Sequence, residues 1–208
     1  MLLTFMKGLL RGRGDTGGHV SGPIRLHIGG RIRHPDWKIL DIRPGPEVDF
    51  VGHCTDLSAF DDESVLEIYA SHVLEHLSYQ SSLAKALREF QRVLVPGGAL
   101  RVSVPDLTIL CQLFLEPALD FDDRFAVMRM MFGGQLNSAD YHYMGFNEAF
   151  LTRYLRETGF DDIRRVDSFG LFKDSSSHRF KGRPISLNLS ARKSTAAGPQ
   201  PAQPESAT

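Results

Sequence analysis

The chain has 208 residues, of which 42% are hydrophobic and 24% are charged, as is typical of one globular domain of ordinary size. Its formal net charge is −1, so the sequence carries no broad basic surface that would attract a nucleic acid. The two cysteines, Cys54 and Cys111, match no disulfide framework and no metal-finger spacing. The composition argues against a nucleic-acid partner and is consistent with a reducing cytoplasm.

Both ends of the chain differ in composition from its middle. Residues 1–22 begin with an apolar stretch that Lys7 interrupts and continue into a Gly-rich linker, so we expect a flexible segment and not a signal peptide. No apolar run approaches the roughly 18 residues that span a bilayer, so we expect no stable membrane insertion. Residues 193–208 contain no side chain large enough for a core and are predicted to be disordered. One domain is therefore expected over residues 23–192.

The first half of that domain shows several short apolar segments that end at turn residues. Strands are predicted at Ile24–Gly30, Lys38–Ile42 and Val48–Val51, and a buried strand at Leu66–Ala70 runs through Ser71 directly into a helix. Only about seven residues separate the first two strands, whereas a parallel crossover usually takes a dozen or more. The first connecting helix is therefore expected to be absent or reduced to a turn.

The second half continues the alternation and then interrupts it. Apolar residues from Leu83 to Leu94 recur at helical spacing, Pro96-Gly97-Gly98 is expected to stop that helix, and Ala99–Val104 reads as another strand. Residues 107–143 are predicted to form a helical insertion over the carboxyl edge of the sheet, with aromatic side chains that could stack on an acceptor.

The last part of the domain is predicted to be a helix followed by two strands. The expected elements are a helix capped by Asn147, with Phe150, Leu151, Tyr154 and Leu155 facing inward, and a closing pair of strands at Ile163–Phe169 and Ile185–Ser190. The whole pattern predicts an α/β fold of Rossmann-like type. It has a mostly parallel sheet, helices on both faces and a shortened first crossover.

Residues 72–76 read His-Val-Leu-Glu-His, which matches the HxxEH zinc motif of inverted metalloproteases. On a helix the two histidines share one face, and Glu75 could act as a base on bound water. The motif nevertheless follows the end of a strand, and no third metal ligand follows it at a spacing typical of a zinc site. We therefore predict no metal site from the sequence.

Read with its neighbours, the same stretch resembles the class I S-adenosylmethionine-dependent methyltransferases. The resemblance covers roughly Ile24 to Ala191 and rests on the segments IRLHIGG, KILDI, CTDLSAF, YASHVLEHL, REFQRVLVPGGALRVSVPDL and FLTRYLRETGFDDIRRV. The chain is most similar to small bacterial predicted methyltransferases of type 11. The resemblance implies a cytoplasmic enzyme that uses S-adenosyl-L-methionine as its cofactor.

The resemblance also implies cofactor contacts near the ends of the first three strands. Gly29 and Gly30 would let the backbone approach the methionine portion, although such glycines are also common in turns. Asp41 would accept hydrogen bonds from the ribose hydroxyls, although an aspartate before Pro-Gly-Pro also initiates turns. Asp56 and Leu57 would contact the adenine, and the alternative for Asp56 is a solvated loop acid.

Ser71 and His72 would lie beside the sulfonium by the same comparison. Methyl transfer to a hydroxyl or amine removes a proton from the acceptor, and imidazole titrates near neutral pH. The candidate bases are His72, Glu75, His76 and His142. The histidines could instead only cap strand and helix ends or lie against the adenosine, and in-line positioning could supply much of the rate.

The chain departs from the family pattern at two positions of the first strand and its loop. Many members have an acid where His27 stands and a third glycine where Arg31 stands. Both residues are kept as cofactor-binding candidates, and Arg31 is hypothesised to reach the cofactor's carboxylate.

The leading hypothesis is therefore a methyltransferase, acting as a monomer or homodimer on a small molecule or glycan. The alternative is a catalytically inactive binding or scaffold protein with the same fold. A nicotinamide dehydrogenase is disfavoured because no GxGxxG follows the first strand.

Overall fold

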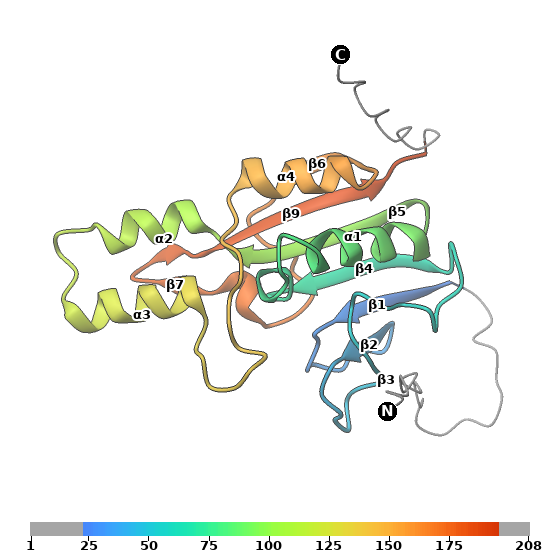
Figure 1. Cartoon of the computed structure of the whole chain (residues 1–208), viewed down its shortest axis with the longest axis horizontal. Coiled ribbons are helices and arrows are strands. Elements are labelled where there is room, and N and C mark those ends of the chain that lie inside the picture. Colours follow the sequence, from blue (N-terminus) through green and yellow to red (C-terminus); the bar gives the residue numbers. More distant parts are fainter. Residues whose placement is uncertain (1–22, 196–208) are drawn as a thin grey trace, which may run out of the picture.

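A computed structural model describes residues 23–195 of the protein. A seven-stranded sheet forms the centre of the fold (Figure 1). The strand order is β3-β2-β1-β4-β5-β9-β6. The strands are β1 (Ile24–Ile28), β2 (Trp37–Asp41), β3 (Phe50–Val51), β4 (Val65–Ser71), β5 (Leu94–Pro105), β6 (Phe160–Arg165) and β9 (Ser186–Lys193). The first five run parallel, and β9 is antiparallel to both of its neighbours, β5 and β6. The predicted α/β fold with a closing pair of strands is confirmed.

The connection from β1 to β2 is the shortened crossover that the sequence predicts. Residues 29–36 contain no helix, yet β1 and β2 pair in parallel with Leu26 opposite Lys38. An extended chain of eight residues spans up to about 27 Å, whereas a five-residue strand is only about 17 Å long. A simple loop is therefore long enough to return to the start of the sheet.

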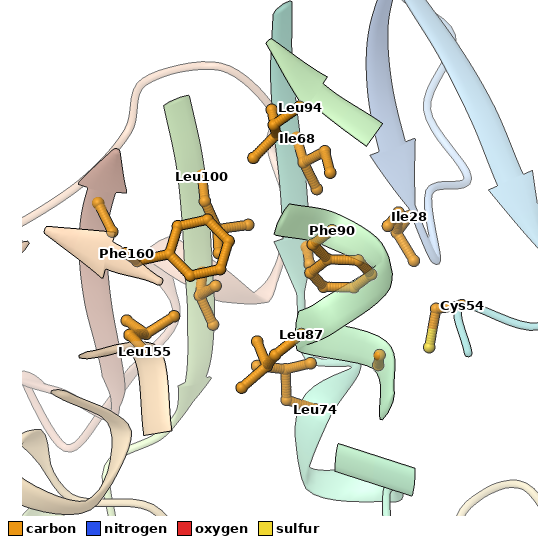
Figure 2. Close-up of a cluster of buried hydrophobic side chains, with 14 of the residues drawn as sticks. Ile28, Cys54, Ile68, Leu74, Leu87, Phe90, Leu94, Leu100, Leu155 and Phe160 are labelled. Carbon is orange, nitrogen blue, oxygen red and sulfur yellow. The ribbon is translucent and has the colours of Figure 1, made fainter. Parts of the chain in front are cut away.

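One face of the sheet carries α1 (Ser82–Val93) and α4 (Glu148–Glu157). Figure 2 shows Leu87 and Phe90 of α1 and Leu155 of α4 within the core formed with the strands, which includes Ile68 and Leu100. Burial of these apolar side chains is the main driving force for docking the helices.

The capping prediction for α4 is confirmed, because the Asn147 side chain accepts a hydrogen bond from the Phe150 amide at 2.8 Å. Leu151 and Leu155 are buried as predicted. The prediction for Phe150 is wrong, because this ring is 49% exposed. The spacing of apolar residues predicted a broad apolar face for α4, and only the part of this face with Leu151 and Leu155 contacts the sheet.

The opposite face is covered differently from the sequence prediction. Within residues 23–195 a loop, residues 169–178, covers this face, and Phe172 from the loop packs on Trp37 and Tyr69. The Tyr69 hydroxyl also donates a hydrogen bond to Asp174 at 2.8 Å. The helices predicted for this face are missing from the described part of the chain, because residues 29–36 and 42–49 are too short to form crossover helices.

The carboxyl end of β4 differs from the predicted strand-to-helix junction. The His72 amide donates to the Ser103 carbonyl at 2.8 Å, so pairing with β5 continues past Ser71, and His72 has a φ of +54°. Only a 3₁₀ turn, η1 (Leu74–His76), follows, and α1 begins at Ser82. The HxxEH residues therefore do not lie on one α-helix.

Two further sequence predictions need correction near the ends of elements. Helix α1 ends at Val93, and Pro96-Gly97-Gly98 lies inside the segment assigned to β5 instead of ending the helix. Lys193, predicted to begin the disordered tail, is buried at the end of β9 and donates to the Leu94 carbonyl at 2.8 Å. The predictions for residues 1–22 and for the tail beyond residue 195 lie outside the described residues.

The insertion forms a helical hairpin beyond the carboxyl end of β5 (Figure 1). Helices α2 (Leu107–Phe114) and α3 (Phe121–Phe132) pack together around a small core that includes Leu110, Val127 and Ile185. The short pair β7 (Arg179–Phe180) and β8 (Arg183–Pro184) and the turn η2 (Ser175–Ser177) complete the secondary structure. No helix in residues 23–195 is long and apolar enough to cross a membrane.

Candidate active site

A cavity of about 550 Å³ lies at the carboxyl ends of the parallel strands. This is where open α/β sheets bind ligands, and the volume is in the range of small-molecule sites. Its wall is formed by the ends of β1 and β2, the residues that follow β3 and β4, and the loop 136–143. Of the residues predicted from the sequence, the cavity is lined by Gly29, Asp41, His72 and His76.

Gly29 brings the backbone of β1 directly to the cavity. Its φ is +73°, a left-handed conformation that favours glycine. A Cβ at this position would lie 2.6 Å from Val73 Cγ2, closer than van der Waals contact allows. The absence of a side chain therefore leaves room between β1 and the segment that follows β4.

Asp41 ends β2 with a buried carboxylate on the cavity wall. Its Oδ1 accepts hydrogen bonds from the Arg43 amide at 2.7 Å and from Arg31 Nη2 at 3.1 Å. Arg31 also pairs with Glu47 at 2.8 Å, so its guanidinium is held at the side of Asp41 and does not line the cavity. The two arginines fix the orientation of a carboxylate that faces the cavity.

The loop after β3 places Asp56 and Leu57 away from the cavity. Leu57 is buried in the main core, and its amide donates to Glu89 Oε2 at 2.8 Å. Arg92 of α1 donates to the Leu57 and Phe60 carbonyls, each at 3.0 Å. This anchoring to α1 draws the loop to the helix side, where Asp56 lines a separate surface depression.

His27, Gly30 and Ser71 also lie outside the cavity lining. His27 points to the opposite face of the sheet, where its ring lies 4.1 Å from Phe172 and 5.0 Å from Tyr69 between centroids. Burial lowers the pKa of His27 to about 4. A Cβ on Gly30 would lie 2.5 Å from the His27 ring, so this glycine makes room for His27.

His72 and Glu75 form a close pair beside the cavity. The Ser186 hydroxyl donates to the Ser175 carbonyl at 2.8 Å, so its oxygen accepts from His72 Nε2 at 3.0 Å. The other ring nitrogen lies 3.2 Å from Glu75 Oε1, an ion pair when the ring is protonated. Both nitrogens of His72 are therefore engaged, which makes this residue a poor proton acceptor for a substrate.

Glu75 is a carboxylate that is only 1% exposed. Burial by itself raises the pKa of Glu75, but His72 and His76 together lower it below its ordinary value. The group is therefore held as a charged carboxylate inside the protein, although it does not line the cavity.

His76 and His142 come together from distant parts of the chain. Their rings make an edge-to-face contact with centroids 4.8 Å apart. His76 Nδ1 lies 3.0 Å from the Tyr141 carbonyl and His142 Nδ1 lies 3.3 Å from the Met131 carbonyl. Burial lowers the pKa of His142, which favours the neutral imidazole at neutral pH.

Several cavity residues were not identified from the sequence. His53 and Cys54 follow β3 directly, and their position after a short strand was a signal that could have found them. Burial raises the pKa of Cys54 to about 12, so this thiol is no nucleophile. Asp140 comes from the loop before α4, for which the sequence offers no local signal, whereas Tyr143 is one of the aromatic residues of the insertion that were expected to stack on an acceptor.

The cavity suits the nucleoside cofactor that the resemblance implies. Asp41 presents a carboxylate suited to vicinal hydroxyls, Gly29 removes the side chain that would block close approach, and Arg43 adds a cation on the wall. The cofactor would therefore be held by the ends of β1 and β2.

Comparisons with known proteins find similarities to methyltransferases. Residues 38–102 match the family model of a methyltransferase domain, and a search of curated proteins finds no match. A SAM-dependent methyltransferase from Archaeoglobus fulgidus has 16% identity and a TM-score of 0.53, with coverage of 83% of this chain and 87% of that chain.

Two further solved structures have the same fold. The Burkholderia thailandensis 1,6-didemethyltoxoflavin-N1-methyltransferase, with bound 1,6-didemethyltoxoflavin and S-adenosylhomocysteine, has 20% identity, a TM-score of 0.51 and coverage of 85% of this chain and 73% of that chain. A possible exported protein from Bordetella parapertussis has 15% identity, a TM-score of 0.51 and coverage of 83% of this chain.

The chain spans only 63% of the length of the Bordetella protein. These structural likenesses show the fold, and the family model matches the segment from β2 to β5 that includes the cavity residues Asp41, His72 and His76. Residues 38–102 are thus similar to a methyltransferase domain, and the chain shares its fold with S-adenosylmethionine-dependent methyltransferases.

Proposed function

We propose that this protein transfers a methyl group from S-adenosyl-L-methionine to a hydroxyl or amine of a small molecule or glycan. The supporting observation is that one cavity is lined both by Gly29 and Asp41 and by His76 and Tyr143. The first pair suits the cofactor, and the second pair suits an uncharged polar acceptor with an apolar face.

The bound cofactor supplies an electrophilic methyl group on a sulfonium. The carboxylate of Asp41 would orient the ribose, and the backbone at Gly29 would approach the methionine portion closely. Tyr143, which is largely exposed on the cavity wall, would pack against the acceptor. The reaction forms a bond from methyl carbon to acceptor oxygen or nitrogen, breaks the carbon–sulfur bond and releases a proton from the acceptor.

His76 is the best-placed acceptor for that proton in the metal-free protein. A backbone carbonyl can only accept a hydrogen bond, so Nδ1 of His76 carries the hydrogen and Nε2 has a free lone pair. His72 lines the same cavity, but Ser186 and Glu75 engage its ring. Glu75 and His142 lie behind the wall and would act through His76.

A titration with S-adenosylhomocysteine tests the cofactor site first. Wild-type protein should bind, and Asp41→Asn should weaken binding by roughly 10-fold or more, since about 1.4 kcal/mol corresponds to tenfold in affinity. The matched control is Asp56→Asn, which changes an acid outside the cavity and should leave affinity unchanged. Equal losses in the two variants, or no binding by the folded wild type, would contradict the proposed site.

Methyl transfer is then measured with labelled cofactor and a panel of small-molecule and glycan acceptors. Transfer that His76→Gln reduces, with cofactor affinity retained, would support the proposed role of His76. Cofactor binding without transfer to any acceptor would favour the inactive scaffold. The observation behind that alternative is Arg31, which replaces a family glycine and binds Asp41.

A further inference from the structure

Glu75 and His76 of η1 and His142 of the loop before α4 form a compact cluster of metal-ligating side chains. One ligand atom of each residue lies within 4.8 Å of the others. The cluster shares two residues with the HxxEH motif, but its third member comes from a remote loop. The remaining motif residue, His72, faces Ser186 and Glu75.

The hydrogen bonds of both histidines leave Nε2 available for a metal ion. His76 Nδ1 and His142 Nδ1 each face a backbone carbonyl, that of Tyr141 at 3.0 Å and that of Met131 at 3.3 Å. Because a carbonyl accepts only, each Nδ1 carries the hydrogen and each Nε2 keeps its lone pair. Histidines that bind metals usually donate their second ring N–H in this way, which fixes the tautomer and the ring orientation.

Glu75 supplies an independent indication of a ligand. It is 1% exposed, and neither carboxylate oxygen accepts a hydrogen bond of good geometry from any residue in the range 23–195. The nearest partner is His72, whose Nδ1 lies 3.2 Å from Oε1. A buried carboxylate without hydrogen bonds is costly, and a cation next to it would remove that cost.

We propose that Glu75, His76 and His142 bind a divalent transition-metal ion of the zinc type. Two imidazoles and one carboxylate suit Zn²⁺ and similar ions, whereas Mg²⁺ and Ca²⁺ prefer oxygen ligands alone. Bonds of about 2.0–2.1 Å place tetrahedral ligand atoms roughly 3.4 Å apart. The ligand atoms therefore need to approach one another by up to about 1.4 Å, which lies within the reach of small side-chain rotations.

The ion would lie in the cavity wall, because His76 lines the cavity. Three protein ligands leave a coordination position open, as in catalytic metal sites. An acceptor hydroxyl bound there would lose its proton more readily, and His76 would then be a ligand instead of the base. The ion would also link η1 to the loop 133–146, fixing the acceptor side of the cavity.

The experiment uses the full chain without an affinity tag. Bound metal is first removed with a chelator, and the protein is then titrated with Zn²⁺ and, separately, with Co²⁺. One ion should bind per chain, and Co²⁺ should give the visible absorption of a site with nitrogen ligands. His142→Gln and His76→Gln should each weaken Zn²⁺ binding by roughly 100-fold, at the upper end of the loss seen when outer partners of ligands are removed. His53→Gln, which changes another histidine of the cavity wall, should bind as the wild type does.

Failure to bind one ion per folded chain, or equal affinities in His142→Gln and His53→Gln, would overturn the metal site. Folding of each variant is checked by circular dichroism and by S-adenosylhomocysteine binding, which His142→Gln should retain because this residue does not line the cavity. Zinc binding by a chain that binds no S-adenosylhomocysteine would support the metal site and contradict the proposed methyl transfer. The two proposals can therefore fail separately.

Discussion

His27 is a buried imidazole between Tyr69 and Phe172, and burial lowers its pKa from 6.5 to about 4. The unfolded chain binds a proton at this residue below about pH 6.5, whereas the folded chain binds it only below about pH 4. The free energy of unfolding should therefore fall as pH is lowered from about 6.5 to about 4. The fall due to this residue is about 3 kcal/mol, since each pKa unit corresponds to about 1.4 kcal/mol.

The measurement is urea unfolding of wild type and His27→Phe at several pH values in that window. The phenylalanine keeps a ring of similar size between the same neighbours but cannot be protonated, so its free energy of unfolding should depend less on pH. Equal slopes for the two proteins would contradict the assignment.

Helix α1 holds the loop after β3 through the guanidinium of Arg92. This group donates to the Leu57 and Phe60 carbonyls and pairs with Glu89 and Asp62. Arg92→Met keeps the aliphatic stem and removes the donors, so it should lower the free energy of unfolding by about 1.5–3 kcal/mol, the range for hydrogen bonds to charged groups. Denaturant unfolding measures this change.

The matched variant on the same helix is Arg88→Met, which replaces an exposed arginine. Its effect should stay within about 0.5 kcal/mol, as is usual for surface substitutions. A similar loss in both variants would mean that the Arg92 contacts do not stabilise the loop.

Residues 23–195 contain three clusters of buried apolar side chains, and the main core is far larger than the cluster within the α2–α3 hairpin. The main core joins the sheet to α1 and α4, whereas the α2–α3 hairpin is held around a few residues that include Leu110 and Val127. Several large apolar side chains of the hairpin, such as Phe121 and Phe125, are exposed. A unit with few buried contacts opens at a lower free energy than the rest of a domain.

Amide hydrogen exchange of the native protein should therefore show that α3 exchanges through a local opening, while β4 and β5 exchange only on global unfolding. The comparison is made by mass spectrometry at increasing sub-denaturing urea concentrations. Exchange of α3 with the same free energy and denaturant dependence as β5 would show that both units unfold together.

Features that depend on local chemistry could be predicted from the sequence. Alternating apolar segments predicted the strands, the short link after Ile28 predicted a crossover without a helix, and Asn147 predicted the start of α4. Gly29 and Asp41, predicted to bind the cofactor, line the cavity, because the carboxyl ends of parallel strands meet at one edge; their contact with the cofactor stays a prediction. Backbone conformation and hydrophobic periodicity act over a few residues, so a sequence displays them directly.

Contacts between residues that are distant in the sequence depend on the tertiary fold. The anchoring of the loop by Arg92 moved Asp56 and Leu57 away from the cavity, and pairing of His72 with Ser103 replaced the predicted helix by a turn. The contact of His142 with Glu75 and His76 depends on the path of a long insertion. Such contacts arise from packing between segments far apart in the chain, and no local pattern of side chains specifies them.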